Sequence, residues 1–289
     1  MPVWSRWLLL AALPALLAAQ EPPPALPYIC PMDPDVRAAS AGKCGKCGMA
    51  LVLGLPERVD FPVELETKPA AVRAGEPVDL EFRVIDPESG DLQTEFDVVH
   101  DKIFHLLYVS HDLEVFAHEH PELGPDGVFR LRHVFPKEAT YRLLADFYPT
   151  GATPQMTPLT LTTAGFEGSL AAPRAPLAED VEPKRGENLT VSLRTEPAEP
   201  LATFKTLLFF ELDTAEGLEK FLGAWAHLLA VSQDTVDLIH AHPAIADGGP
   251  QVQVNRIFPR PGMYRIWVQV QREGVVNTVP FTIWVRELG

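Results

Sequence analysis

An internal repeat is the feature of this sequence that most constrains its fold. Residues 104–121 (FHLLYVSHDLEVFAHEHP) match residues 226–243 (AHLLAVSQDTVDLIHAHP) at a constant offset. The match resumes one residue further apart in the pattern FP-x4-YR, at 135–142 and 258–265. Because a segment repeated at a fixed spacing encodes the same structural unit twice, we expect the chain to fold as two related domains.

Short segments in which apolar and polar residues alternate occur in both copies. Each copy opens with Gly-Glu followed by such a segment, at 78–84 and at 189–193, and alternation recurs at 141–147 and 264–270. A period of two indicates β-strands, and turns rich in Gly, Pro and Asp separate these segments. We therefore predict an all-β chain with two immunoglobulin-like antiparallel β-sandwich domains, preceded by a small Cys-rich metal-binding knuckle. One helix is expected in the second copy, at Thr214–Leu222.

The N-terminus predicts export. Residues 1–19 combine Arg6, an apolar stretch and small residues before Gln20, which is the pattern of a secretory signal peptide, with an uncleaved anchor as the alternative. We expect a periplasmic or secreted protein, since no later run is long and apolar enough to span a membrane. The expected order is signal peptide (1–19), Pro-rich spacer (20–27), Cys-rich domain (28–55), first β-sandwich (56–165), linker (166–180) and second β-sandwich (181–289).

All three cysteines lie in the Cys-rich domain. Cys44 and Cys47 have the Cys-x-x-Cys spacing with which two thiolates on one turn bind a single metal ion. Cys30 and the thioethers of Met32 and Met49 add soft donors, which favour Cu(I) or Zn(II) over Mg or Ca. A Cys44–Cys47 disulfide or a thioredoxin-like redox pair are the alternatives, although a redox pair usually accompanies a βαβ unit.

This segment also carries a family resemblance. Its pattern, YxCPMxPxV followed by GKCxKCGMxLV, resembles the heavy-metal-binding domain of bacterial copper-transporting ATPases and of periplasmic copper/silver efflux adaptors. The resemblance implies that the metal ligands are Cys30, Met32, Cys44, Cys47 and Met49. The family usually has His where this chain has Asp33, and Pro where it has Gly45. Asp33 is retained as a candidate ligand because its carboxylate suits a harder ion such as Zn(II).

Histidine supplies a second group of candidate ligands. Six of the nine histidines occupy equivalent positions of the two copies, namely His105, His118, His120, His227, His240 and His242. An even-length loop that pairs Val109 with Glu114 would place His105 opposite His118, with His120 on the same face. Each copy would then present three imidazoles and an open position, which suits Cu(II) or Zn(II).

The same histidines have a structural interpretation. His105 and His227 lie in apolar strands and are also candidates for hydrogen-bonded core residues, and His-x-His-Pro is suited to the end of a strand. The other histidines of the first copy, His100, His111 and His133, are expected to support its triad from a second layer.

Composition and the lack of certain motifs argue against several classes of function. A net charge of −15 and the lack of a Lys/Arg stripe exclude a nucleic-acid partner. The sequence contains no Gly-x-Ser-x-Gly, phosphate-loop or His-Glu-x-x-His motif, so we expect no enzymatic activity. The repeats loosely resemble a β-sandwich module of bacterial secreted proteins. We predict an exported, soluble heavy-metal-binding protein, with copper preferred over zinc, for metal sequestration, delivery or resistance. The alternatives are a module that binds a metal-efflux or envelope protein and, less favoured, a metal-dependent enzyme that uses a three-His site.

Overall fold

The computed structural model of the chain describes residues 26–32, 36–54, 58–168 and 176–288. The expected signal peptide and the candidate ligand Asp33 lie outside these residues. Every regular element within them is a β-strand, so the all-β prediction is confirmed. No helix in the described ranges has the length and apolar character needed to cross a membrane.

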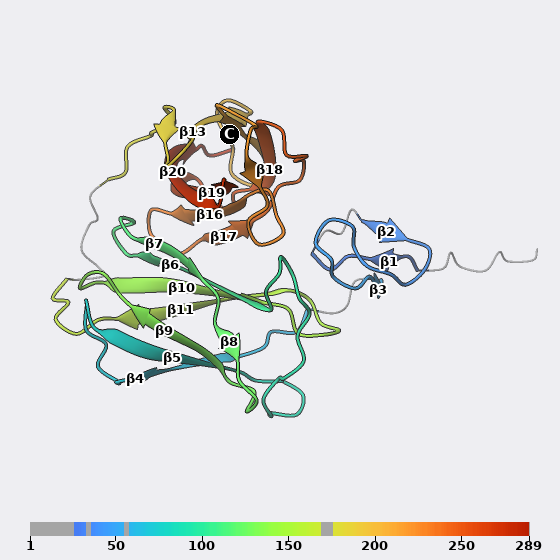
Figure 1. Ribbon diagram of the computed structural model, residues 1–289, viewed down its shortest axis with the longest axis vertical. Coiled ribbons are helices and arrows are strands. Elements are labelled where there is room, and N and C mark those ends of the chain that lie inside the picture. The colour runs from blue at the N-terminus through green and yellow to red at the C-terminus, as the bar shows by residue number, and fades with distance from the viewer. Residues whose placement is uncertain (1–25, 33–35, 55–57, 169–175, 289) are drawn as a thin grey trace, which may run out of the picture.

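The first repeat folds as a sandwich of two antiparallel four-stranded sheets (Figure 1). The outer sheet has the order β4 (Val63–Lys68), β5 (Pro77–Val84), β9 (Phe129–Val134) and β8 (Glu122–Leu123). The inner sheet has the order β11 (Gln155–Thr162), β10 (Thr140–Phe147), β6 (Phe104–Ser110) and β7 (Phe116–Glu119). Apolar side chains from the facing surfaces, including Phe82, Phe104 and Phe129, fill the space between the two sheets.

The second repeat has the same two-layer arrangement. One sheet has the order β12 (Lys184–Arg185), β13 (Thr190–Glu196), β14 (Lys205–Leu212) and β18 (Gln251–Ile257). The other has the order β15 (Leu218–Glu219), β19 (Gly262–Arg272), β16 (His227–Ser232) and β17 (Leu238–Ala241), with β20 (Val275–Val285) also paired to β19. A separate core that includes Phe210, Tyr264 and Phe281 lies between these sheets.

The first long strand of the second repeat is equivalent to a different strand of the first repeat from the one that the sequence predicted. The order β13-β14-β18 in the second repeat matches β4-β5-β9 in the first, so β13 is the equivalent of β4. The sequence comparison had instead matched β13 with β5, because both follow a Gly-Glu pair. That dipeptide marks a turn before a strand in each repeat, but it does not specify which strand follows.

The predicted helix at Thr214–Leu222 is wrong. The segment instead forms a turn followed by the short strand β15, which pairs with β19 through Leu218↔Arg272 and Glu219↔Gln271. Gly217 in this turn has a φ of +74°, which a right-handed helix cannot accommodate. Strand pairing with β19 therefore overrides the local helical propensity of the segment.

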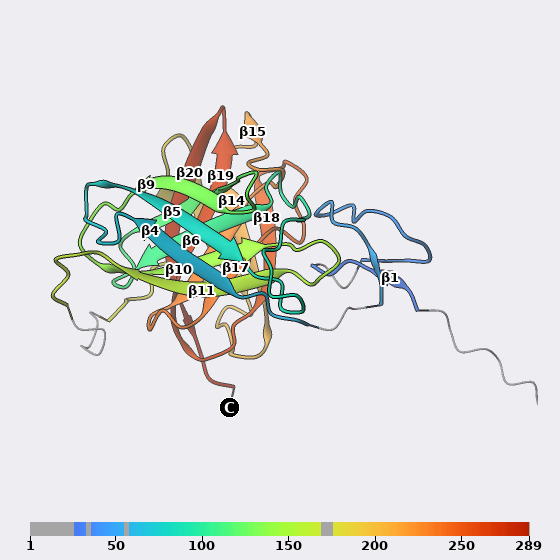
Figure 2. The same ribbon diagram turned by 90° about the horizontal axis from the view of Figure 1, so that it is seen from below.

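The two repeats pack together through one sheet of each. Along β6, alternate side chains such as Leu106 enter the core of the first repeat, whereas Leu107 and Val109 point the other way and meet Leu229 and Val231 of β16. Both faces of β6 and β16 are therefore buried. The strands β6 and β7 lie against β16 and β17 in Figure 1, and in Figure 2, seen from below, the sheets of the first repeat overlap those of the second.

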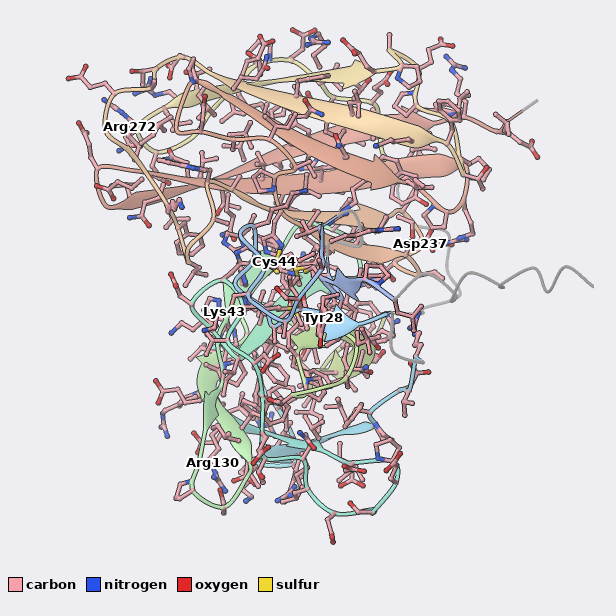
Figure 3. All side chains as sticks on the ribbon, turned by 90° about the vertical axis from the view of Figure 1, so that its right-hand side faces the viewer. Tyr28, Lys43, Cys44, Arg130, Asp237 and Arg272 are labelled. Atoms are coloured by element: carbon pink, nitrogen blue, oxygen red, sulfur yellow. The ribbon has the colours of Figure 1, made fainter. Side chains whose placement is uncertain are left out.

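The N-terminal knuckle is a small sheet beside this junction. It comprises β1 (Tyr28–Ile29), β2 (Arg37–Ala38) and β3 (Val52–Leu53), in the order β2-β1-β3. Its sulfur-rich interior packs against Val99 and Tyr148 of the first repeat. Figures 1 and 3 both show the knuckle at the level where the repeats meet, with Cys44 near that level in Figure 3.

The apolar contact between the repeats predicts a matched pair of variants. Trp267 is 5% exposed and its ring stacks on Phe116, with 5.3 Å between ring centroids. Trp267→Ala should lower the free energy of unfolding by roughly 3 kcal/mol, because it leaves a cavity between the repeats. Trp284→Ala, at a site 52% exposed, should cost less than about 1 kcal/mol. Urea unfolding followed by fluorescence measures both, and equal losses would contradict a packed contact at Trp267.

Candidate metal centres

The three cysteines of the knuckle converge in its interior. Cys30, Cys44 and Cys47 are buried, none of them forms a disulfide, and their sulfur atoms all lie within 4.8 Å of one another. The Cys30 and Cys47 sulfurs are 3.5 Å apart. All three are therefore positioned to bind one ion, and the alternative of a Cys44–Cys47 disulfide is not observed.

A tight turn places two of these thiols. The amide of Gly48 donates to the carbonyl of Cys44 at 2.9 Å, and the amide of Cys44 donates to the carbonyl of Met49 at 2.8 Å. Gly48 has a φ of +83°, a left-handed conformation that glycine adopts without a steric cost. The turn thus holds Cys44 and Cys47 on the same side, while β1 presents Cys30 to them.

Both predicted thioether donors belong to the same interior. Met49 is 2% exposed among the cysteines, and Met32 packs against them while partly buried. The hydrogen bond with Cys30, together with burial, raises the pKa of the Cys47 thiol well above its usual range. The Cys47 thiol is therefore protonated in the metal-free chain, and a metal ion that binds it must displace a proton.

The histidine-bearing hairpins differ from the predicted register by one residue on each side of the loop. Leu107 pairs with His118, and Leu229 pairs with His240 in the second repeat. His105 is therefore not directly opposite His118, as predicted. The four-residue loop begins at His111, because Ser110 and Val115 pair through an amide-to-carbonyl hydrogen bond of 3.1 Å. A pairing offset of two preserves the face on which each side chain lies, so the imidazoles still converge.

The two predicted triads do not form separate sites, because they meet at the contact between the repeats. The ring of His118 lies within 5.3 Å of those of His105 and His120 in its own repeat, centroid to centroid. It lies 5.2 Å from the ring of His227 and 5.6 Å from that of His240, both in the other repeat. We call His100, His105, His118, His120, His227, His240 and His242 the histidine cluster.

Hydrogen bonds across the junction hold the cluster in a reciprocal arrangement. His118 of β7 donates from Nδ1 to Gln269 Oε1 of β19, at 2.9 Å. His240 of β17 pairs through Nδ1 with Asp146 Oδ2 of β10, at 2.5 Å. Each repeat thus orients a histidine of the other from the equivalent strand, in the manner of groups that orient metal-binding imidazoles.

Burial keeps the cluster uncharged near neutral pH. Removal from water lowers the pKa of His105 to about 4 and that of His240 to about 3. It lowers the pKa of His118 and His227 well below the usual range for the same reason. Neutral imidazole is the form that binds a metal ion, so the cluster needs little deprotonation to do so.

Two of the three supporting histidines predicted in the first repeat lie elsewhere. His133 contacts the Tyr108 hydroxyl at 2.7 Å on the far side of β6, and His111 packs against Phe166. His133 lies in β9, on the other side of the first sandwich core, and His111 lies in the hairpin loop, which the sequence comparison did not resolve. His100 does join the cluster, where its ring lies 3.7 Å from that of His242, centroid to centroid.

Sequence reasoning missed the two residues that link the repeats, Asp146 and Gln269. Each is a polar residue flanked by apolar neighbours, and they occupy equivalent positions of β10 and β19. Asp146 is fully buried and Gln269 is 7% exposed. A polar residue repeated at one position of a buried strand was the available signal.

The knuckle and the histidine cluster are close neighbours in the fold. The carbonyl of Val99, which packs against the knuckle, accepts a hydrogen bond from His105 Nε2 at 3.0 Å. Tyr148, the other residue on which the knuckle packs, follows two residues after Asp146. Burial, Asp146 and Cys47 together hold the pKa of the Tyr148 hydroxyl well above its usual range. Two short segments of the first repeat therefore connect both sets of candidate ligands.

Comparison with protein families supports a heavy-metal-binding knuckle. A model described as the heavy metal binding domain matches residues 28–52, and one described as a domain of unknown function, DUF8832, matches residues 57–165 and 184–287. No curated protein matches the chain. The chain therefore carries a heavy-metal-binding domain, as its cysteine pattern implied.

Solved structures resemble the chain only weakly. The adhesin InvE of Yersinia pseudotuberculosis is 10% identical with a TM-score of 0.26, covering 79% of this chain and 61% of its own. The Escherichia coli adhesin FdeC is 13% identical with a TM-score of 0.26, covering 88% and 76%. The first three fibronectin-type domains of chicken CNTN1 are 8% identical with a TM-score of 0.22, covering 85% and 76%.

The buried carboxylate at the junction predicts a pH-dependent effect. Burial raises the pKa of Asp146 to about 6 from an ordinary value of 3.8, so folding disfavours its ionised form. The protonated Asp146 carboxyl makes its full contribution to stability below pH 3.8. That contribution is lost as the pH rises through 6, because the carboxyl then ionises in its buried site. Asp146→Asn should therefore raise the free energy of unfolding of the metal-free chain at pH 7, by up to roughly 3 kcal/mol. The gain should shrink towards pH 4.

Urea unfolding of both chains from pH 4 to pH 7 measures this difference. Asp126→Asn is the control, since the Arg130 guanidinium lowers the pKa of that exposed carboxyl and its neutralisation should bring no gain. If the difference in free energy of unfolding between wild type and Asp146→Asn did not vary with pH, the raised pKa of Asp146 would be contradicted.

Proposed function

The chain belongs to the DUF8832 family, and we propose that it is an exported copper-binding protein that captures Cu(I) in its heavy-metal-binding domain and sequesters or delivers it. The observation that carries this proposal is the convergence of three buried thiols within 4.8 Å of one another. Two methionines border the same interior. A site with this many soft sulfur donors favours Cu(I) over harder ions, with Zn(II) as the competing choice.

The surroundings of the knuckle support metal handling without turnover. Its thiols are buried against the first repeat, next to residues that contact the histidine cluster. Four of its seven histidines are buried between the repeats and the other three are half-buried, which limits the room for a substrate. We therefore favour ligand exchange between protein sites over catalysis.

Export is supported by the N-terminal pattern alone. Residues 1–19 have the charge, apolar stretch and small residues of a signal peptide. A periplasmic or secreted location would place the protein where copper/silver efflux adaptors act, and such an adaptor or another envelope protein is the partner class that we propose. Fractionation of cells that express the full chain, with the N-terminal sequence of the mature form, tests this location.

Removal of two thiols tests the knuckle. Cys44→Ser/Cys47→Ser should abolish one Cu(I) site, because two of its three sulfur donors are replaced by hydroxyl groups that bind Cu(I) poorly. Titration against a chromophoric Cu(I) chelator under reducing conditions measures the loss, which should exceed 100-fold in affinity. The control is Lys43→Gln, an exposed change beside Cys44 that leaves every sulfur in place. Unchanged Cu(I) stoichiometry and affinity in the double variant would refute the proposal.

A further inference from the structure

His118 is the point at which the histidines of the two repeats meet. It belongs to two groups whose ligand atoms all lie within 4.8 Å of one another, one with His105 and His120 and the other with His227 and His240. The first group lies within one repeat, whereas the second draws on both. The question is which ring nitrogens in these groups present lone pairs.

In the first repeat, hydrogen bonds decide the tautomers of two rings. His105 Nε2 donates to the carbonyl of Val99 at 3.0 Å, so its Nδ1 carries a lone pair when the ring is neutral. His118 Nδ1 donates to Gln269, whose amide nitrogen is oriented by a hydrogen bond to Thr278, so His118 Nε2 also carries a lone pair. These two nitrogens are 3.1 Å apart. Two lone pairs that face each other repel unless a cation lies beside both.

The second repeat contributes an unpaired ring nitrogen to the same place. His240 pairs through Nδ1 with the Asp146 carboxylate, and its Nε2 is buried with no hydrogen-bond partner. His240 is 2% exposed. His227 Nε2 donates to the carbonyl of Phe221 at 2.9 Å, so its Nδ1 accepts from His242 Nε2, 3.1 Å away. The Nε2 atoms of His100, His120 and His240, by contrast, are buried without a hydrogen-bond partner. Such unpaired nitrogens are costly, and several in one cluster indicate a missing positive ligand.

We propose that histidines of both repeats form one composite metal centre, in which His118 and His240 bind the same divalent ion, of the borderline class of Cu(II) and Zn(II). Imidazole nitrogens suit these ions, and the nitrogens around a tetrahedral ion are roughly 3.3 Å apart. The His105–His118 spacing is already close to this value. Asp146 and Gln269 act as positioning residues, because each fixes a ring of the opposite repeat.

The position of His118 implies that the composite centre binds one ion. Its Nδ1 is engaged by Gln269, so Nε2 is the one nitrogen that it offers to either group. The two groups therefore compete for that atom and are not filled independently. This separates a composite centre from two independent three-histidine sites, one in each repeat, as the sequence alone had suggested.

The test uses the full mature chain carrying Cys44→Ser/Cys47→Ser, so that its result does not depend on the knuckle. Cu(II) is titrated against a competing chelator, with the bound metal quantified and nitrogen coupling read by electron paramagnetic resonance. We expect one tightly bound Cu(II) per chain. His118→Ala and His240→Ala, from different repeats, should each weaken its binding at least 10-fold. The double variant should bind little more weakly than either single variant, because both remove ligands of the same ion.

Two further variants guard against loss of folding. His118→Gln and His240→Gln keep most of the side-chain volume, and circular dichroism checks that they fold. The control is His111→Ala, in the same hairpin but outside the cluster, which should leave Cu(II) affinity unchanged. Two results would overturn the proposal. One is a second Cu(II) that stays bound with full affinity in each single variant, as independent sites require. The other is no tight Cu(II) in the chain with Cys44→Ser/Cys47→Ser, as expected if water bridges the rings.

Discussion

Burial of both faces of the inner sheets is the constraint on which the rest of the structure depends. One face of β6 and β16 completes a sandwich core, and the other closes the contact between the repeats. Polar side chains on the second face are removed from water and must find partners there. The histidines meet this requirement only in part, through backbone carbonyls, Asp146 and Gln269, and His240 Nε2 is left without a hydrogen-bond partner. The same desolvation that stabilises the contact keeps the imidazoles neutral.

Sequence patterns predicted the features of the fold that depend on local periodicity. The β-sandwich class, the grouping of the three cysteines and the shared face of His105, His118 and His120 all follow from spacing. The exact register did not, because a four-residue loop can move by one residue without exposing an apolar side chain. Local sequence patterns could not predict that the two histidine triads converge. It depends on which sheets pack against each other, and the visible clue was the unbroken apolar run of β6 and β16.

The two repeats differ in charge at one pair of equivalent positions beside the histidine cluster. Equivalent strands present a carboxylate at Asp146 and a neutral amide at Gln269. A carboxylate makes the imidazole that it orients a stronger donor to a metal ion, whereas an amide fixes only its direction. The cluster therefore has nearly symmetric geometry with an asymmetric electrostatic environment, and His240 is its strongest candidate donor. The free energy that the ionised carboxylate costs in the metal-free chain is offset only when a cation is bound nearby.

The reciprocal hydrogen bonds across the junction have a consequence for how such a centre could have arisen. Each repeat orients a histidine of the other from the equivalent strand, as the two subunits of a symmetric dimer would. A protein with one copy could complete this arrangement only by self-association, and its occupancy would fall on dilution. Joining the copies in one chain replaces that dependence with an effective local concentration, on the order of millimolar for short linkers. A single chain would then keep both halves of such a binding site together at any dilution.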